Sequence, residues 1–508
     1  MSYLRRWLLG TLVVLLVATA CSSAGDGESA GPSERSEEAL PSGTPPASRS
    51  VEPTPQGQQK PNIVLFLTDD QTLEEMAVMP QTRRLIGDRG VTFTRAFAQY
   101  PLCCPMRATL MTGQLPHNHG VLGNEPPWGG YSAFDASSTM PQWLQEAGYR
   151  TGIVGKWFNG YPVEGDVTHI DPGWDDWYVP VWQPYNYRRF NVNENGTVRR
   201  HRQYQTDWQA DQMSELVGRY AAEDVPFFLY GSFLAPHVGT PREPDDPPQQ
   251  KTPNVADEYR GRFGKPLPDK PNRPERDLSD KNEWWFQQRL SKRFTTAGMT
   301  AAYQQRRESL LSVDDAVAQV VQRLREEGEL DDTLLVFTSD NGYLLGEHGQ
   351  RNQKIFGYED SIRVPLLVAG PGIPAGEERD QPVSLVDLPA TFLRRAGAEP
   401  GLRQDGLDLQ RVVDDPAYAA DRRLLLEAGG WPKPDIDRMY TGIRTADGRV
   451  LLRYWNDHVE TYDLAEDPHQ LDGTTSRAEE AWREDLLAEL DELETCAGAR
   501  ACNPGVGE

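Results

Sequence analysis

The chain has little positive charge, few cysteines and few histidines for its length. It contains 52 Lys and Arg against 76 Asp and Glu in 508 residues, a net charge of -24, with 5 Cys and 8 His. This deficit argues against a surface that binds nucleic acid or an anionic membrane. No internal repeats are visible. The composition is globular, and the length predicts at least two domains, or one large domain with a subdomain.

The N-terminus carries an export pattern. Arg5-Arg6 precede an apolar run from Trp7 to Ala20, too short for a comfortable transmembrane helix, and small residues lead to Cys21. The pattern resembles a bacterial lipoprotein signal over residues 1–21, which implies lipidation of Cys21; an ordinary secretory peptide is the alternative. Residues 22–60, rich in Ser, Pro, Glu and Gly, are predicted to be a disordered linker. We expect an exported protein, at the cell surface or periplasmic side, attached to a bacterial membrane only by an N-terminal lipid.

Continuous apolar runs appear from Pro61 onward, and polar residues follow them. Such runs are typical of strands buried on both faces of a parallel sheet, whose ligand sites lie beyond the carboxyl ends of the strands. A helix is predicted from about Ser312 to Gly328. The pattern predicts an α/β fold with a doubly wound, mostly parallel sheet over residues 61–415. The predicted strands are 62–67, 150–154, 225–233, 333–338 and 364–369.

Residues 416–508 contain shorter alternating segments, near 424–426, 441–444, 450–454 and 459–464. A helical pattern follows from about Ala478 to Leu493. These features predict a smaller C-terminal subdomain with an antiparallel sheet. Cys496 and Cys502 lie in a Gly- and Ala-rich tail, and outside the cytoplasm we expect them to form a disulfide. The insertion from about Pro241 to Arg293 has weak periodicity and receives no prediction.

A cysteine-containing stretch at residues 101–113 is the candidate functional centre. Cys103, Pro105 and Arg107 form a C-x-P-x-R pattern, and the apolar run after them can begin a helix whose N-terminal amides attract anions. A cysteine between an arginine and a positive helix end is typical of a nucleophile for a negatively charged substrate. The alternative for Cys103 and Cys104 is a pair of buried hydrophobic residues or a redox pair.

This stretch resembles the signature of the sulfatase family. The resemblance implies an alkaline-phosphatase-like fold and conversion of Cys103 to formylglycine, an aldehyde that hydrates to a gem-diol, by a formylglycine-generating maturation enzyme. Met106 stands where the family usually has Ser, Thr or Ala, while the C-x-P-x-R core is present. A Tyr-Asp-Leu-x-x-Asp-Pro run, Tyr462 to Pro468, is similar to one near the C-terminus of family members.

Two pairs of oxygen-bearing side chains follow predicted strands. They are Asp69-Asp70 and Asp340-Asn341. Oxygen ligands favour Ca²⁺ or Mg²⁺ over zinc, although either pair taken alone is more often a helix cap or a turn. The resemblance implies that these four residues, together with position 103, bind a divalent cation, typically calcium.

The resemblance also assigns roles to four cationic side chains. Arg107 is expected to hold the hydrated aldehyde and the metal ligands, Lys156 the aldehyde hydroxyl and sulfate, and Lys354 the sulfate and the leaving oxygen. His237, in Ala-Pro-His, matches a histidine that contacts sulfate and protonates the leaving group. Fixed cations around developing negative charge are the expected electrostatic catalysts. The implied reaction transfers sulfate to the hydrate at position 103 and then regenerates the aldehyde as inorganic sulfate leaves.

One departure leaves the general base open. Many family members read Gly-Lys-Trp-His, whereas Phe158 stands at the histidine position here. His117, His119 and His348 are the candidates to replace it, and His119 and His348 are also candidate substrate-binding residues. A structural role for any of the three is an equal alternative.

A closer resemblance points to the N-acetylglucosamine-6-sulfatase branch. The supporting runs are Leu-Cys-Cys-Pro, Pro-His-Asn-His, Gly-Lys-Trp-Phe-Asn-Gly-Tyr, Pro172-Gly173-Trp174, Tyr185-Asn186-Tyr187 and Leu311-Ser312-Val313-Asp314-Asp315. They imply a sulfated carbohydrate substrate, such as a glycosaminoglycan 6-O-sulfate. The aromatic-rich section from Trp174 to Tyr204 is predicted to supply stacking faces for a sugar or, alternatively, a second apolar core.

Two other functions remain open at this point. The first is a phosphodiesterase or phosphomonoesterase of the alkaline phosphatase superfamily, which shares this fold and metal arrangement. The second is a lipoprotein that binds sulfated glycans without hydrolysing them.

Overall fold

A ten-stranded mixed sheet forms the centre of the molecule. The computed structural model describes residues 60–162, 165–248, 250–282, 296–429, 438–474, 476–477 and 479–506, without the side chains of Arg351 and Asn352. The predicted signal, Cys21 and nearly all of the predicted linker lie outside the described residues. The described residues belong to one compact unit, Gly57–Glu508, so the domain boundary at residue 416 stays a prediction.

The parallel centre of the sheet contains the strands that were predicted from continuous apolar runs. Neighbouring strands β9, β1, β8, β4 and β5 are all parallel. Antiparallel strands flank them, with β13 beside β9, β6 beside β5 and β7 beside β6, which confirms a mostly parallel mixed sheet. The order is β14 (Glu377–Arg379), β2 (Val91–Phe93), β13 (Leu366–Ala369), β9 (Thr333–Ser339), β1 (Asn62–Thr68), β8 (Phe227–Ser232), β4 (Arg150–Gly155), β5 (Asp176–Val181), β6 (Phe190–Glu194) and β7 (Thr197–His201).

The strand predicted over 364–369 is divided at Pro365. Proline has no N–H to donate to a sheet ladder. The residues before it form β12 (Arg363–Val364), which pairs with β3 (Ala96–Phe97) in a three-stranded sheet completed by β15 (Val383–Ser384), whereas the residues after it form β13.

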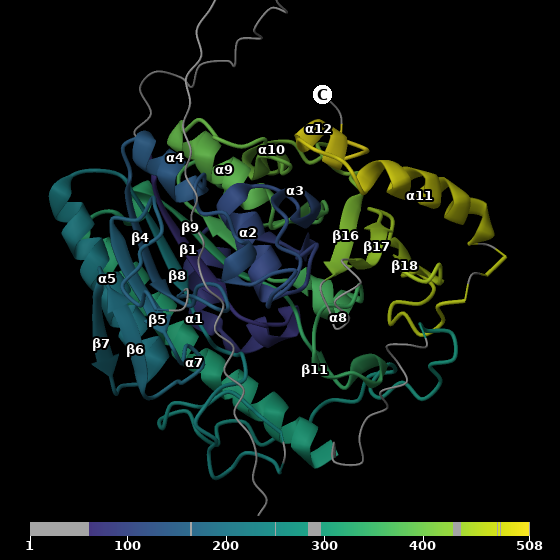
Figure 1. The fold of residues 1–508 in the computed structure, drawn as a ribbon, viewed down its shortest axis with the longest axis horizontal. Coiled ribbons are helices and arrows are strands. Elements are labelled where there is room, and N and C mark those ends of the chain that lie inside the picture. The colour runs from purple at the N-terminus through teal and green to yellow at the C-terminus, as the bar shows by residue number, and fades with distance from the viewer. Residues whose placement is uncertain are drawn as a thin grey trace, which may run out of the picture. The chain divides into compact units, whose positions relative to one another are not determined.

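Helices cover both faces of the main sheet (Figure 1). Alternate residues of β1 point to opposite faces. Ile63, Leu65 and Leu67 pack with α2 (Cys103–Thr112), α4 (Met140–Glu146) and α9 (Asp387–Ala396). Val64 and Phe66 pack with α5 (Gln205–Glu223) and α7 (Thr296–Glu327). The result is a three-layer α/β/α arrangement, as the sequence predicted.

The start of α7 corrects the prediction of a helix from about Ser312. The helix begins at Thr296, and it ends at Glu327 before Gly328, whose φ is 82°. Its first half buries polar residues, among them Gln305, Arg306 and Glu308. Because these buried positions are not apolar, hydrophobic periodicity does not reveal them.

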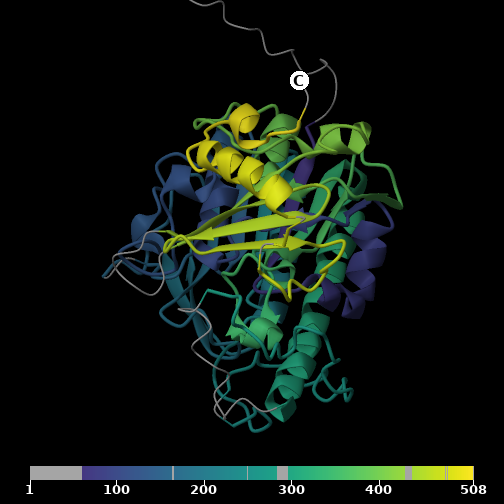
Figure 2. The same ribbon diagram turned by 90° about the vertical axis from the view of Figure 1, so that its right-hand side faces the viewer.

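A four-stranded antiparallel sheet lies in the C-terminal region (Figure 2). Its strands are β16 (Leu424–Gly429), β17 (Arg438–Arg444), β18 (Arg449–Tyr454) and β19 (Val459–Asp463). Helix α11 (Glu480–Leu493) packs Trp482, Leu486 and Leu490 against this sheet. A disulfide joins Cys496 to Cys502 at the end of α12 (Ala499–Cys502).

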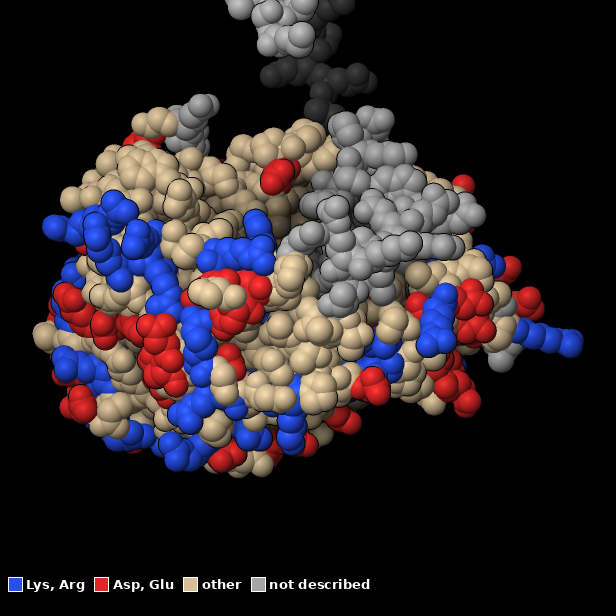
Figure 3. Space-filling view, turned by 90° about the horizontal axis from the view of Figure 1, so that it is seen from below, with Lys and Arg blue, Asp and Glu red and all other residues tan. Residues whose placement is uncertain are grey.

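None of the helices in the described part of the chain is long and apolar enough to cross a membrane. On the face drawn in Figure 3, Lys and Arg side chains are interspersed with Asp and Glu side chains. The connecting elements are η1 (Leu73–Val78), α1 (Pro80–Thr82), η2 (Arg83–Gly87), α3 (Pro116–His119), η3 (Tyr131–Ala133), η4 (Leu330–Asp332), β10 (Leu344–Leu345), η5 (Glu347–Gly349), β11 (Arg351–Gln353), α8 (Glu359–Ile362) and α10 (Leu409–Asp414).

Candidate active site

The carboxyl ends of the central parallel strands bring the predicted site residues together. Asp69 and Asp70 follow β1, Lys156 follows β4, and Asp340 follows β9. Backbone hydrogen bonds continue the registers past the strand ends: Asp340 N–H donates to Thr68 O (3.1 Å), and Lys156 N–H donates to Ser232 O (2.9 Å). Parallel strands end at the same edge of a sheet, which is why residues distant in sequence meet there.

Helix α2 positions Cys103 and Arg107 at this edge. Cys103 is the first residue of the helix and Arg107 lies one turn later, so both side chains lie on one face. Gly113 ends the helix with a φ of 70°, a left-handed conformation that suits glycine. Both side chains are buried, with exposed fractions of 1% for Cys103 and 0% for Arg107.

Four predicted cation ligands lie close enough to share one ion. Potential ligand atoms of Asp69, Asp70, Cys103 and Asp340 all lie within 4.8 Å of one another. Asn341 donates from Nδ2 to Asp70 Oδ1 (2.8 Å), while its Oδ1 is buried and has no hydrogen-bond partner among the described residues. An unpaired buried oxygen beside a set of carboxylates fits a hard divalent cation such as Ca²⁺ or Mg²⁺.

Arg107 joins the strand ends to one another. Its Nη2 donates to Asp340 Oδ2 (2.8 Å) and Asp69 Oδ2 (3.3 Å). Its Nη1 donates to Ser232 Oγ (2.6 Å) and to the backbone oxygen of Lys156 (2.9 Å). A planar guanidinium presents several donors in a fixed geometry, so Arg107 fixes the relative positions of the two carboxylates.

Two lysines approach the cluster from different sides. Lys156 Nζ forms an ion pair with Asp69 Oδ2. Lys354 Nζ forms one with Asp70 Oδ1 and donates to Cys103 Sγ (3.2 Å). Cys103 Sγ in turn donates to Asp69 Oδ1 (3.4 Å). The thiol therefore lies between a carboxylate and an ammonium group.

Burial and charge separate the pKa values in this cluster. Burial raises the pKa of Asp69, but Lys156 and the other nearby cationic groups outweigh it and hold that pKa well below its usual range. Burial, with the neighbouring Asp69 charge, raises the pKa of Asp340 to about 6. Burial and Asp69 also raise the pKa of the Cys103 thiol. An unmodified Cys103 is thus a protonated thiol at neutral pH, which is unlike an activated cysteine nucleophile.

His237 presents one ring nitrogen to the cluster. Its Nδ1 hydrogen-bonds to the backbone oxygen of Val238 (2.7 Å), and since a carbonyl only accepts, Nδ1 carries the hydrogen. Its Nε2 lies 3.7 Å from Asp70 Oδ2. Burial lowers the pKa of His237 to about 4, despite the nearby carboxylates. The ring stacks on Tyr185 with 4.9 Å between ring centroids.

The backbone of Asp70 adopts a conformation that non-glycine residues rarely use, with a φ of 70°. Its N–H donates to Asp340 Oδ1 (3.2 Å), and its carbonyl accepts from Arg306 Nη2 (2.5 Å). Arg306 also forms a buried ion pair with Glu75, with 2.7 Å between Nη2 and Oε2. Strained backbone persists where the surroundings hold it, and here that support comes from α7.

Three histidines predicted near the site contact other parts of the fold. His117 hydrogen-bonds through Nδ1 to Glu427 (3.0 Å) and through Nε2 to Cys496 O (2.8 Å). His119 uses Nε2 for Thr109 Oγ1 (3.1 Å) and accepts at Nδ1 from Val121 N–H (3.1 Å).

His348 is buried beneath Tyr358, with 3.9 Å between ring centroids, and its Nδ1 bonds to Glu275 (2.7 Å). Among the described residues, no hydrogen bond or ion pair joins His117, His119 or His348 to the cluster at Cys103. Each of these three rings thus has partners elsewhere in the fold, and substrate contacts for His119 and His348 stay predictions.

The aromatic section from Trp174 to Tyr204 is divided between the core and the lining of a pocket, and sugar stacking stays a prediction. Trp177, Tyr187 and Tyr204 are core residues. Tyr185 and Trp182, in contrast, line a pocket of about 1210 Å³. Tyr185 also lies with its ring centroid 5.0 Å from Lys156 Nζ, so this pocket adjoins the cluster.

Several residues at the site had no sequence prediction. Ser232 lies one residue before the end of the strand predicted over 225–233, a position that could have indicated it. Asn159 lies in the Gly-Lys-Trp-Phe-Asn-Gly-Tyr run. Arg306 gives no sequence signal, because its partners Asp70 and Glu75 lie more than two hundred positions away in the chain.

The sequence of this chain is similar to those of known protein families. The sulfatase family model matches residues 61–398, and the model for the C-terminal region of N-sulphoglucosamine sulphohydrolase matches residues 346–495. N-acetylglucosamine-6-sulfatase of Homo sapiens is 29% identical over 497 residues, which cover 89% of this chain and 87% of that protein.

Solved structures show the same fold. A protein in complex with its substrate, D-glucosamine-2-N,6-O-disulfate, has a TM-score of 0.71 at 23% identity, covering 86% of this chain and 98% of that one. Phosphonate monoester hydrolase of Agrobacterium radiobacter has a TM-score of 0.65 at 20% identity, covering 85% and 96%. Because the family model spans well over half of the sequence, the chain belongs to the sulfatase family of sulfuric ester hydrolases.

Proposed function

We propose that this protein hydrolyses a carbohydrate 6-O-sulfate of the N-acetylglucosamine-6-sulfate type and releases inorganic sulfate. The observation that carries the proposal is the position of Cys103, whose Sγ lies 3.4 Å from Asp69 Oδ1 and 3.2 Å from Lys354 Nζ inside a buried carboxylate cluster. Buried carboxylates repel a sulfate, so a nucleophile beside them needs added positive charge before a sulfate can bind. The oxygen ligands of this cluster could hold a cation that supplies this charge.

Asp69, Asp70, Asp340 and Asn341 would hold the cation, with position 103 beside them. A bound Ca²⁺ or Mg²⁺ supplies positive charge that polarises a sulfate oxygen and balances the buried carboxylates. Conversion of Cys103 to formylglycine supplies a hydrated aldehyde, which replaces the poorly ionised thiol as the nucleophile.

The remaining charged groups bind and orient the sulfate ester. Lys354 and Lys156 have ammonium groups directed into the cluster from two sides, where they attract sulfate oxygens. Arg107 uses both of its terminal nitrogens on the strand ends, so it holds the carboxylates in position. Preorganised cations of this kind stabilise charge that develops as the ester bond breaks.

His237 is the proton-carrying group at the leaving oxygen. Since Nδ1 donates to Val238 O, the nitrogen directed into the site is Nε2. With a pKa of about 4, the free ring is neutral and Nε2 is unprotonated. Nε2 must therefore first take up a proton, which the anionic sulfate favours as it binds, and then transfer it to the departing alcohol oxygen. Phe158 cannot replace the histidine found at its position in many family members, since it stacks on Phe134 with 4.2 Å between centroids and has no proton to give.

We also propose that the protein acts outside the cytoplasm as a lipid-anchored enzyme. The export pattern ending at Cys21 and the Cys496–Cys502 disulfide both support this location, because disulfides persist in oxidising compartments. Its partners are then a sulfated carbohydrate and the formylglycine-generating enzyme that prepares position 103.

The test uses protein produced together with a formylglycine-generating enzyme. Mass spectrometry of the tryptic peptide spanning residues 96–107 determines whether Cys103 is converted, and sulfate release from defined 6-O-sulfated saccharides determines activity. Loss of the thiol with release of sulfate supports the proposal. An intact thiol with saccharide binding alone would favour a non-catalytic glycan-binding protein instead.

A phosphate or phosphonate ester is the second candidate substrate, because the fold is also that of a phosphonate monoester hydrolase. Initial rates on an aryl sulfate, an aryl phosphate and a phosphodiester separate the two. Faster turnover of the phosphodiester would replace the sulfatase proposal.

A further inference from the structure

The pocket beside the carboxylate cluster indicates which kind of saccharide is attached to the reactive sulfate. Tyr185 lines this pocket, and its ring lies 5.0 Å from Lys156 Nζ and 4.9 Å from the His237 ring centroid. Two further lining residues lead to the reactive helix: Asn124 Oδ1 accepts from Cys104 N–H (2.9 Å), and Asn159 N–H donates to Cys104 Sγ (3.2 Å). A sulfate at the cluster therefore places the attached saccharide in this pocket.

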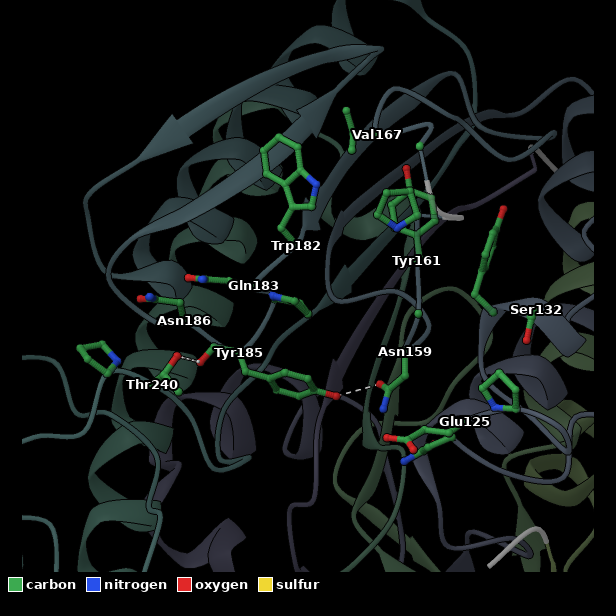
Figure 4. A pocket seen from close by; sticks show the side chains of 18 residues that line it. Glu125, Ser132, Asn159, Tyr161, Val167, Trp182, Gln183, Tyr185, Asn186 and Thr240 are labelled. Atoms are coloured by element: carbon green, nitrogen blue, oxygen red, sulfur yellow. Dashed lines mark hydrogen bonds between the residues drawn. The ribbon is translucent and has the colours of Figure 1, made fainter. Parts of the chain in front are cut away.

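The lining consists almost entirely of neutral side chains. The described residues that line the pocket include no Lys, Arg or His, and their only charged side chain is Glu125. Figure 4 shows Trp182, Gln183, Asn186 and Thr240 on one side of the pocket. Ser132, Asn159 and Glu125 lie on the other side, with Tyr185 directed between the two groups.

Amide groups are the main polar groups of this lining. Asn159 Oδ1 accepts from Tyr185 Oη (2.7 Å), and Asn186 Oδ1 accepts from Arg189 N–H (2.8 Å). Like Asn124, these two residues use their side-chain oxygen within the protein, and their Nδ2 groups have no partner among the described residues. Neutral N–H donors match sugar hydroxyl and acetamido oxygens.

Trp182 supplies a flat apolar face at the same pocket. Its exposed fraction is 60%, and the only other exposed large hydrophobic residue in the described part of the chain is Val225, at 37%. Its φ of 65° is a strained conformation for a residue with a large side chain. An exposed, conformationally strained tryptophan lining a pocket indicates a binding face, and aromatic rings stack on the apolar face of a sugar.

We propose, on the basis of the function proposed above, that the saccharide attached to the reactive sulfate is uncharged. It lies against Trp182 and binds the amides of Asn124, Asn159 and Asn186. A second sulfate, such as an N-sulfate, would find no cationic partner among the described lining residues and would meet the Glu125 carboxylate. Anions in such surroundings bind poorly. The pocket volume of about 1210 Å³ leaves room for more than one neutral sugar ring.

The experiment compares N-acetylglucosamine-6-sulfate with D-glucosamine-2-N,6-O-disulfate. We expect kcat/KM to favour the monosulfate by at least about tenfold, since an unpaired charge in the pocket forfeits a charge-assisted hydrogen bond. The difference is expected mainly in KM. Equal or better turnover of the disulfate would overturn the inference while leaving the sulfatase proposal intact.

Binding separates this inference from the proposed function. Calorimetric titration of the Cys103→Ala protein with the same two sugars reports on the pocket without chemistry. Tighter binding of the monosulfate with no hydrolysis by the mature enzyme would refute the proposed reaction and support the pocket assignment. Equal affinities, or tighter binding of the disulfate, would refute the pocket assignment.

Variants assign the preference to named residues. Glu125→Gln should narrow the monosulfate preference by about two- to fivefold, the size of a solvent-exposed charge interaction, whereas Glu399→Gln removes an exposed carboxylate outside the pocket lining and should not change it. Trp182→Ala should raise KM for the monosulfate about tenfold, with Val225→Ala as the matched control. An unchanged KM in Trp182→Ala would exclude the stacking role.

Discussion

Asn341 donates a 2.8 Å hydrogen bond from Nδ2 to Asp70 Oδ1, while its own Oδ1 is buried and has no hydrogen-bond partner among the described residues. One side chain thus orients a carboxylate and offers an oxygen of its own. Both contributions depend on the strand ends β1 and β9 being parallel neighbours.

The first prediction concerns this amide. Asn341→Ala should weaken Ca²⁺ binding at least about tenfold, because it removes an oxygen ligand and the donor to Asp70. Asn341→Asp keeps an oxygen and should lose less. Titration of Ca²⁺ into chelator-treated protein measures both. An unchanged affinity in the alanine variant would show that Asn341 is not a ligand.

Cys103 and its neighbour provide a matched pair for the second prediction. Both thiols are buried, but only Cys103 contacts Asp69 and Lys354, whereas Cys104 accepts from Asn159 N–H. Cys103→Ala should abolish sulfate release, and Cys104→Ala should retain most of it. Each should lower the free energy of unfolding by only about 1 kcal/mol. Near-normal sulfate release by Cys103→Ala would remove the nucleophile assignment.

The sequence predicts the centre of the sheet well because its strands are continuous apolar runs. β1 and β9 are each followed by a polar pair that contributes to the carboxylate cluster, so one pattern indicates both the strand and the site. Strands β5, β6 and β7 were not predicted, because they lack a continuous apolar run and the aromatic residues around them suit either a buried core or exposed faces. Only the structure separates buried Trp177 from exposed Trp182.

Long-range partners explain the remaining differences. His117 meets Glu427, which lies 310 residues away, and a histidine in a motif gives no indication of such a partner. Arg306 is buried in the first half of α7, where it pairs with Glu75. Several buried residues there are polar, so they do not form the apolar pattern from which a helix is predicted.

The third prediction uses the opposite pKa shifts of His117 and His119. Burial lowers the pKa of His119 to about 3. Between about pH 6.5 and 3, His119 is protonated in the unfolded chain, where its pKa is about 6.5, but stays neutral in the folded protein. The free energy of unfolding therefore falls as the pH drops through this range. Burial opposes charge on His117, but its hydrogen bond to Glu427 outweighs this and raises its pKa. Its stabilisation is therefore complete below about pH 6.5 and is lost as pH rises through the raised value.

Urea denaturation between about pH 4 and 8 checks both signs, with slopes limited to about 1.4 kcal/mol per pH unit for one proton. Relative to wild type, His119→Gln should lose less stability on acidification. His117→Gln should lose less stability as the pH is raised. Parallel pH profiles for wild type and both variants would contradict the two assignments.

The last prediction separates the stabilising role of Arg306 from its positioning role. Arg306→Leu leaves the Glu75 carboxylate buried and unpaired, which should cost about 3–5 kcal/mol of unfolding free energy. Arg306→Leu with Glu75→Leu should recover much of that stability. It should not recover Ca²⁺ affinity, because the donor to the strained Asp70 backbone is still missing.

Arg422 supplies the control, since its ion pair with Asp387 is equally buried, with 2.6 Å between Nη1 and Oδ2, and touches none of the cluster residues. Arg422→Leu should destabilise the protein to a similar degree and leave Ca²⁺ affinity within about twofold of wild type. Wild-type affinity and sulfate release in the Arg306–Glu75 double variant would mean that α7 only stabilises the fold. A selective loss would mean that this helix holds the Asp70 ligand in its left-handed conformation.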